Sequence, residues 1–222
     1  MSRVLNRTIL TGNIIMLMYG VLEYILITAT PQLGSAPSPS GLGLDPLHTG
    51  FLQLAFGLST MIFGPVFGLL VAKRKGYNLK LLVPGVVITA ISFLILVFFH
   101  SASAGINASL FVFGMASALI SNTVIVTIVS FTPVEYTGVS SAATNMMRII
   151  GGAIGPVITT VILTSDTISV TVDNVAKSYP SPVTFDILYM VGASMAIASV
   201  FLAIKMKRLA AKMTPLTAED IA

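Results

Sequence analysis

The sequence predicts an all-α membrane protein that crosses the bilayer six times, and three observations support this fold class. Hydrophobic residues make up 55% of the chain, and Asp, Glu, Lys and Arg only 9%. In a soluble domain roughly a quarter of the residues are charged, because its surface faces water. Six runs of mostly apolar residues reach the length of about 20 residues that a spanning helix needs. Basic residues also gather in segments that would all lie on one side of the membrane.

The apolar runs set the expected domain organisation. A transmembrane domain over 8–206 follows a cytoplasmic lead-in over 1–7 and precedes a cytoplasmic tail over 207–222. A cleaved signal peptide is the alternative for the first run, but this run is too long and no small-residue cleavage site follows it. We expect the spanning helices at about residues 8–30, 49–72, 80–99, 106–131, 141–164 and 183–205.

The charge of the connecting segments predicts the orientation. Arg3 and Arg7 precede the first helix, and further basic residues lie over 73–80 and 205–212. The opposite side holds a single basic residue, Lys177. The positive-inside rule therefore places both ends of the chain in the cytoplasm. The expected location is the plasma membrane. The net charge of +4 is explained by this topology, so nucleic acid is not an expected partner.

Two outer connections differ in character. Residues 31–48 are rich in Pro, Gly and Ser and are expected to be irregular and mobile. Residues 165–182 are polar and partly β-branched. Each is interpreted either as a plain connector or as a cover over an external vestibule.

Glu23 is the strongest single candidate for a functional residue. It lies well inside the first run, where an ionised carboxylate facing hydrocarbon costs from about 2.5 to more than 10 kcal/mol. It must therefore face a cavity or be protonated, and a buried carboxylate that exchanges a proton suits a proton-coupled carrier. The alternative is a protonated Glu23 that only ties two helices together by hydrogen bonds.

Arg148 is the second ionisable residue inside a predicted span. It lies about two turns from the cytoplasmic end of the fifth run. Its side chain either extends to the lipid headgroups or faces inward, where it pairs with a carboxylate or an anionic group of a substrate. Polar residues inside the spans either line a solute pathway or form bonds between helices. Further candidates for the pathway are Tyr19, Gln53, Asn122 and Asn145.

Two small-residue motifs predict close helix contacts. Each contains GxxxG next to a proline, which permits both a close approach of helices and a bend. The candidate packing and gating residues are Gly64, Pro65 and Gly68 in the second run, and Gly151, Gly152, Gly155 and Pro156 in the fifth.

Enzymatic chemistry is not expected. The sequence has no GxSxG, HExxH or P-loop motif, and no carboxylates paired at helical spacing. Cys is absent, and His48 and His100 lie far apart, so no metal site is predicted.

Three stretches resemble the second half of a major facilitator superfamily transporter, with the closest likeness to the fourteen-helix drug:proton antiporters. They are residues 64–76, residues 133–156 and the segment Asn6-Arg7-Thr8. The first resembles the family's glycine-containing helix end with a basic cytoplasmic turn. It departs from the family at the usual acidic position, where Ala72 or Lys73 stands, so that acid's gating role does not carry over.

The resemblance implies one half of a helical bundle built as 3+3 inverted repeats, with the solute bound near the membrane midplane between two such halves. We expect multidrug-efflux-like, proton-coupled transport of a hydrophobic or amphipathic solute by alternating access. A second six-helix half, as a separate chain or in a homodimer, is the expected partner besides the lipid bilayer. No cofactor is expected, and the proton gradient is the expected driving force. The alternative is a scaffold or inactive truncated remnant that does not transport.

Overall fold

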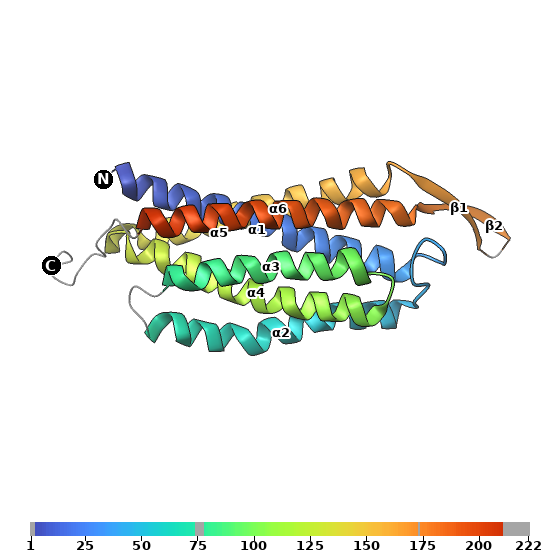
Figure 1. Cartoon of the computed structure of the whole chain (residues 1–222), viewed down its shortest axis with the longest axis horizontal. Coiled ribbons are helices and arrows are strands. Elements are labelled where there is room, and N and C mark those ends of the chain that lie inside the picture. Colours follow the sequence, from blue (N-terminus) through green and yellow to red (C-terminus); the bar gives the residue numbers. More distant parts are fainter. Residues whose placement is uncertain (1–2, 74–77, 173, 211–222) are drawn as a thin grey trace.

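The computed structural model describes residues 3–73, 78–172 and 174–210, and these residues form six long helices and one small hairpin (Figure 1). All six helices are long and apolar enough to cross a membrane. The predicted six-helix fold is confirmed. Basic residues expected at 74 and 75, and the tail beyond residue 210, lie outside the described residues. The helices are α1 (Arg3–Ser35), α2 (Pro46–Lys73), α3 (Asn78–Phe99), α4 (Ser103–Ser130), α5 (Thr137–Leu163) and α6 (Pro182–Ala210).

The helices are longer than the apolar runs, and the end of α1 is one of the places where they extend furthest. We expected α1 to end before Pro31, but it continues to Ser35 with Pro31 inside. A proline removes one backbone donor, and a helix in a membrane tolerates this loss when the freed carbonyl finds another partner. The expected irregular loop is therefore shorter, over 36–45. Backbone bonds hold it to the end of α1, with Leu42 N donating to Leu33 O at 3.0 Å and Leu44 N to Gly34 O at 2.8 Å.

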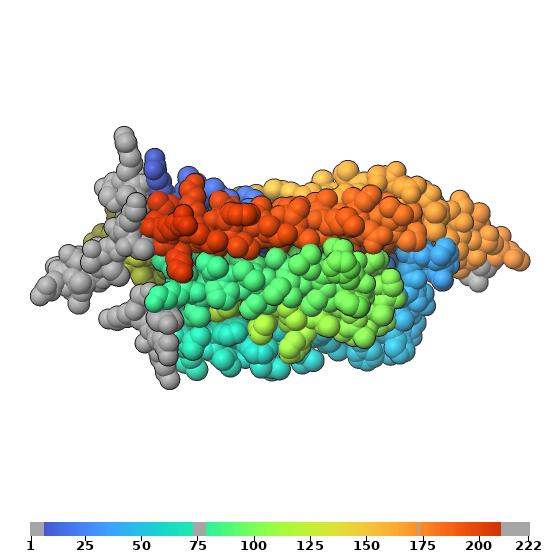
Figure 2. Space-filling model, in the orientation of Figure 1, coloured from blue at the N-terminus to red at the C-terminus, as the bar shows by residue number. Residues whose placement is uncertain are grey.

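The connection between α5 and α6 folds as an antiparallel hairpin of β1 (Thr167–Val172) and β2 (Val175–Pro180). Its alternating Thr, Ile, Ser and Val residues favour a strand, and Asn174 in the turn has a φ of 60°. The Ser40 hydroxyl donates to the Pro180 carbonyl at 2.5 Å, so this hairpin meets the loop between α1 and α2. The hairpin extends past the end of the helices (Figure 2).

The helix contacts place α1 and α4 at the centre of the bundle. Helix α1 packs on α5 and α6, and α4 packs on α2 and α3. Helices α2 and α5 are at the margin, with 11% and 28% of their apolar spans buried, against 61% for both α1 and α4. The start of α1 and the end of α6 lie at one end of the bundle, and the hairpin lies at the other (Figure 1).

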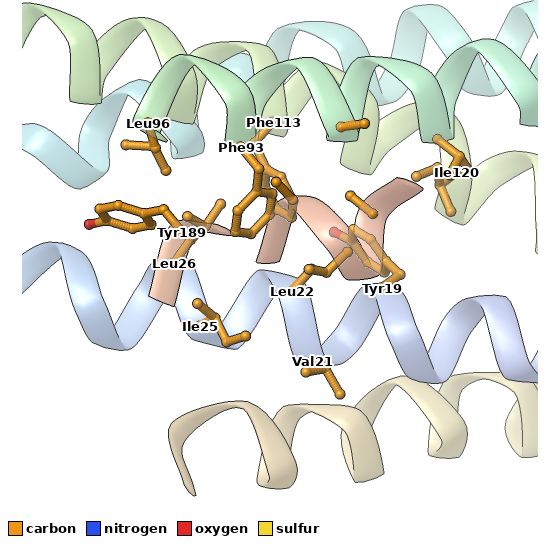
Figure 3. Packing of buried hydrophobic residues seen from close by; sticks show 14 of the residues in the cluster. Tyr19, Val21, Leu22, Ile25, Leu26, Phe93, Leu96, Phe113, Ile120 and Tyr189 are labelled. Atoms are coloured by element: carbon orange, nitrogen blue, oxygen red, sulfur yellow. The ribbon is translucent and has the colours of Figure 1, made fainter. Parts of the chain in front are cut away.

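The core contains buried residues of α1, α3, α4 and α6, and aromatic contacts link the first three of these helices (Figure 3). Tyr19 of α1 stacks on Phe113 of α4 with ring centroids 5.9 Å apart. Phe93 of α3 meets the same Phe113 edge-on at 6.1 Å. Packing and hydrogen bonds, rather than exclusion of water, hold helices together in lipid. This core therefore fixes the inner face of α1, which also carries Glu23.

Candidate functional site

Glu23 and Arg148 form an ion pair between α1 and α5. Arg148 Nε donates to Glu23 Oε2 at 2.8 Å, and Arg148 Nη2 donates to Glu23 Oε1 at 2.6 Å. This two-pronged geometry matches the planar guanidinium fork to a carboxylate. The Glu23 side chain is 4% exposed and that of Arg148 is 34% exposed. Of the two interpretations of Arg148, the structure therefore has the inward one, paired with a carboxylate.

Glycines hold the two helices close enough for this pair. A Cβ on Gly20 would lie 2.1 Å from the Arg148 carbonyl oxygen, and one on Gly151 would lie 2.1 Å from the Leu17 carbonyl oxygen. Both distances are far below any real contact, so only glycine fits at the crossing. Gly151 follows Arg148 by three residues, and this spacing puts them on one face of α5. The helix face that permits the close approach thus also presents the guanidinium.

The other α5 motif residues continue this contact along α1. A Cβ on Gly155 would lie 2.7 Å from the Val21 carbonyl oxygen, and one on Gly152 would lie 2.7 Å from the Tyr24 ring. Pro156 lies inside α5, where it removes the amide that would otherwise bond to the Gly152 carbonyl.

Tyr19 of α1 packs its ring against the Arg148 guanidinium. The guanidinium carbon lies 5.5 Å from the centre of the Tyr19 ring, within the range of a cation–π contact. The buried Tyr19 hydroxyl is hydrogen-bonded to the Ser117 hydroxyl of α4. Tyr19 and Glu23 are four residues apart and so face the same way. The ring and the carboxylate together fix the orientation of Arg148.

A small cavity between α1, α2 and α4 lies beside Glu23. Glu23, Ile27 and Gln53 contribute to its lining, and the remaining walls are apolar. Its volume of about 10 Å³ is at the lower limit of what one water molecule needs. Glu23 is thus paired with Arg148 and also lines a space of about the size of one water molecule.

Gln53 of α2 forms a hydrogen bond with the backbone of α1. Its Nε2 donates to the Ile27 carbonyl at 2.9 Å. In a regular helix this carbonyl would accept a bond from the backbone N–H of residue 31. Pro31 has no N–H, so the Ile27 carbonyl has no partner within its own helix. Gln53 of α2 thus satisfies the backbone group that Pro31 frees in α1, and this bond explains how α1 continues past the proline.

The remaining predicted residues, all within the described part of the chain, form no hydrogen bond or ion pair with Glu23 or Arg148. Asn122 Nδ2 donates to the Ala118 carbonyl at 2.8 Å and approaches the Gly64 carbonyl at 3.4 Å. Asn145 is exposed, about one turn before Arg148 on α5. A Cβ on Gly64 would meet nothing within 4 Å, and one on Gly68 would meet only Asn122 at 3.6 Å. Pro65 is exposed beside them.

Other interhelical polar contacts join residues whose pairing the sequence did not predict. Thr144 of α5 donates to Asn13 of α1 at 2.9 Å. At the hairpin end, His100 Nε2 lies 3.5 Å from Asp186 Oδ1. The partners are far apart in the chain and join only once the helices have packed. No group of three residues that could bind a metal ion occurs among the described residues.

Comparison with protein families identifies one match. Residues 2–156, more than half of the chain, match the family model described as Major Facilitator Superfamily. This range takes in α1 to α4, both members of the ion pair and the glycine crossing. No match was found among curated proteins.

Proposed function

The chain belongs to the major facilitator superfamily, a family of membrane transporters, and we propose that it is one six-helix half of a proton-coupled carrier. The solute is small and amphipathic or hydrophobic, and it crosses by alternating access. The Glu23–Arg148 pair is the observation that supports this proposal most. Ionisable residues inside a membrane span are costly and usually serve function. This pair also joins two helices at a crossing where both backbones are in contact.

The second half of the carrier would cover the outer faces of α2 and α5. These helices expose large apolar side chains, among them Met61 on α2 and Ile149 on α5, 76% and 62% exposed. Transporters of this kind bind their solute near the midplane between two halves, which are related by an axis along the membrane normal. A separate chain or a second copy of this chain satisfies that geometry.

Protonation of Glu23 is the proposed coupling step. The ionised carboxylate accepts both bonds from Arg148. A protonated carboxyl carries no charge and loses the electrostatic part of this interaction. The contact between α1 and α5 then weakens on one side of the crossing. A ligand or proton drives a conformational change only if it alters the relative stability of two packing arrangements.

The test is proton-driven dye transport by the chain together with a second half. Glu23→Gln keeps the size of the side chain and removes the proton site. Glu135→Gln is the matched control, because Glu135 is exposed in a short connecting helix. We expect the Glu23 variant to lose acceleration by a proton gradient, and the Glu135 variant to keep it. Unchanged proton dependence in the Glu23 variant would refute the proton site. No transport by the unmodified chain would favour the scaffold or remnant interpretation.

A further inference from the structure

We infer that the solute carries an anionic group, which binds Arg148 when Glu23 is protonated, so that proton and solute cross in the same direction. This inference rests on the proposed function, because it uses the same ion pair. It differs from the exchange that resemblance to drug:proton antiporters implies. Three features of the site support this inference: the exposure of Arg148, its unused hydrogen-bond donors and the net charge of the pair after protonation.

The reachable charge in the pair is the cation. Arg148 is 34% exposed at its side chain, whereas Glu23 is 4% exposed and has both oxygens engaged. A solute that approaches α5 from its open side therefore meets the guanidinium first. A cationic solute would have to displace Arg148 before it reached the carboxylate.

Arg148 also has donors left for an anion. A guanidinium has five N–H groups, and Glu23 engages one on Nε and one on Nη2. The exposed Asn145 side chain, about one turn away on α5, offers an amide with two more donors. A carboxylate, phosphate or sulfonate accepts bonds from such a set, and a cation does not.

The charge balance couples this anion to the proton. The ionised pair is neutral overall, and a proton on Glu23 leaves a single positive charge in the site. An unpaired charge inside the membrane is costly, so a bound anion stabilises the protonated state. Proton and anion thus each favour the binding of the other, as reciprocal linkage requires. A cation would instead compete with the proton for Glu23.

The other groups that face Glu23 do not alter this balance. On α1 Tyr19 lies beside both Glu23 and Arg148, and Tyr24 lies near Arg148. Helix α2 contributes the uncharged Gln53. The described charges of α6 lie at its ends, with Asp186 near the start and the basic residues in the last turns. Helix α4 has no charged residue.

The experiment measures binding of 4-fluorobenzoate to the full chain in lipid nanodiscs by fluorine NMR, with 4-fluorobenzylammonium as the cationic counterpart. Glu23→Gln should tighten 4-fluorobenzoate binding about tenfold or more, because it frees two charged donors. Arg148→Gln and the double variant should lose this binding. Arg148→Lys keeps the charge without the fork and should bind at an intermediate level.

The control is again Glu135→Gln, which should bind 4-fluorobenzoate like the unmodified chain. Equal binding by the Glu23 and Arg148 variants would overturn the inference, as would preferential binding of 4-fluorobenzylammonium through Glu23. The two proposals fail separately. Proton-driven transport that needs Glu23, combined with anion binding that ignores Arg148, would refute only the inference. Proton-driven transport that does not need Glu23 would instead refute the proton site of the proposed function.

Discussion

The bond between Gln53 and the Ile27 carbonyl predicts a conditional effect of mutation. Gln53→Leu removes the donor and leaves the carbonyl freed by Pro31 without a partner. In lipid such a group finds no water to replace the lost bond. In the variant Pro31→Ala, by contrast, residue 31 supplies its own amide to Ile27, and Gln53 is no longer needed.

The magnitude follows from the two contributions. An interhelical hydrogen bond in a membrane protein is worth about 0.6–2 kcal/mol, and an unsatisfied buried group costs about 1–3 kcal/mol. We therefore expect Gln53→Leu to lower the free energy of unfolding by about 1–2 kcal/mol in the native background. In the Pro31→Ala background the same change should cost less than about 0.5 kcal/mol.

The assay is reversible unfolding in mixed micelles, followed by circular dichroism, for the four members of this cycle. Gln32→Leu is the matched control, because Gln32 is exposed and approaches only the Thr28 carbonyl of its own helix, at 3.3 Å. It should leave stability nearly unchanged. An equal cost of Gln53→Leu in both backgrounds would contradict this prediction, since it would show that Pro31 and Gln53 act independently.

Two further predictions concern the crossing of α1 and α5 and the start of α2. Gly151→Ala forces α1 and α5 apart and should cost about 1–3 kcal/mol in unfolding assays, whereas Gly57→Ala, in open space, should cost nothing. A stable Gly151→Ala variant would contradict the close crossing. At the start of α2, the His48 backbone N–H donates to Asp45 and holds the pKa of that carboxyl below its usual range. Protection of the first α2 amides in hydrogen exchange should therefore be complete above the ordinary carboxyl pKa and fall as pH drops through the lowered one. Asp45→Asn should abolish this pH dependence, and an unchanged profile would exclude Asp45 as its source.

The sequence predicted the six helices because the bilayer imposes a simple requirement of length and apolarity. It did not predict where α1 ends, because the effect of Pro31 depends on Gln53 of the next helix. It singled out Glu23 and Arg148 separately, each from the cost of charge in lipid. Their pairing, across 125 residues, depends on α1 and α5 lying side by side.

The small-residue motifs show the same limit. Both contain GxxxG, yet Gly151 contacts the α1 backbone whereas a Cβ on Gly64 would meet nothing within 4 Å. The motif permits a close approach without specifying a partner helix. The role of Tyr19 likewise depends on Ser117 of α4, which no local pattern links to it.

The most direct test of the account is a double-mutant cycle of Glu23→Gln and Arg148→Gln, read out as the free energy of unfolding in a lipid environment. Each single variant leaves one charge unpaired and should destabilise the chain, by about 1–3 kcal/mol given the partial exposure of Arg148. The double variant should be more stable than the sum of the two losses implies, with a coupling of at least about 1 kcal/mol. Strictly additive effects would show that Glu23 and Arg148 do not interact, and would contradict both proposals that rest on this ion pair.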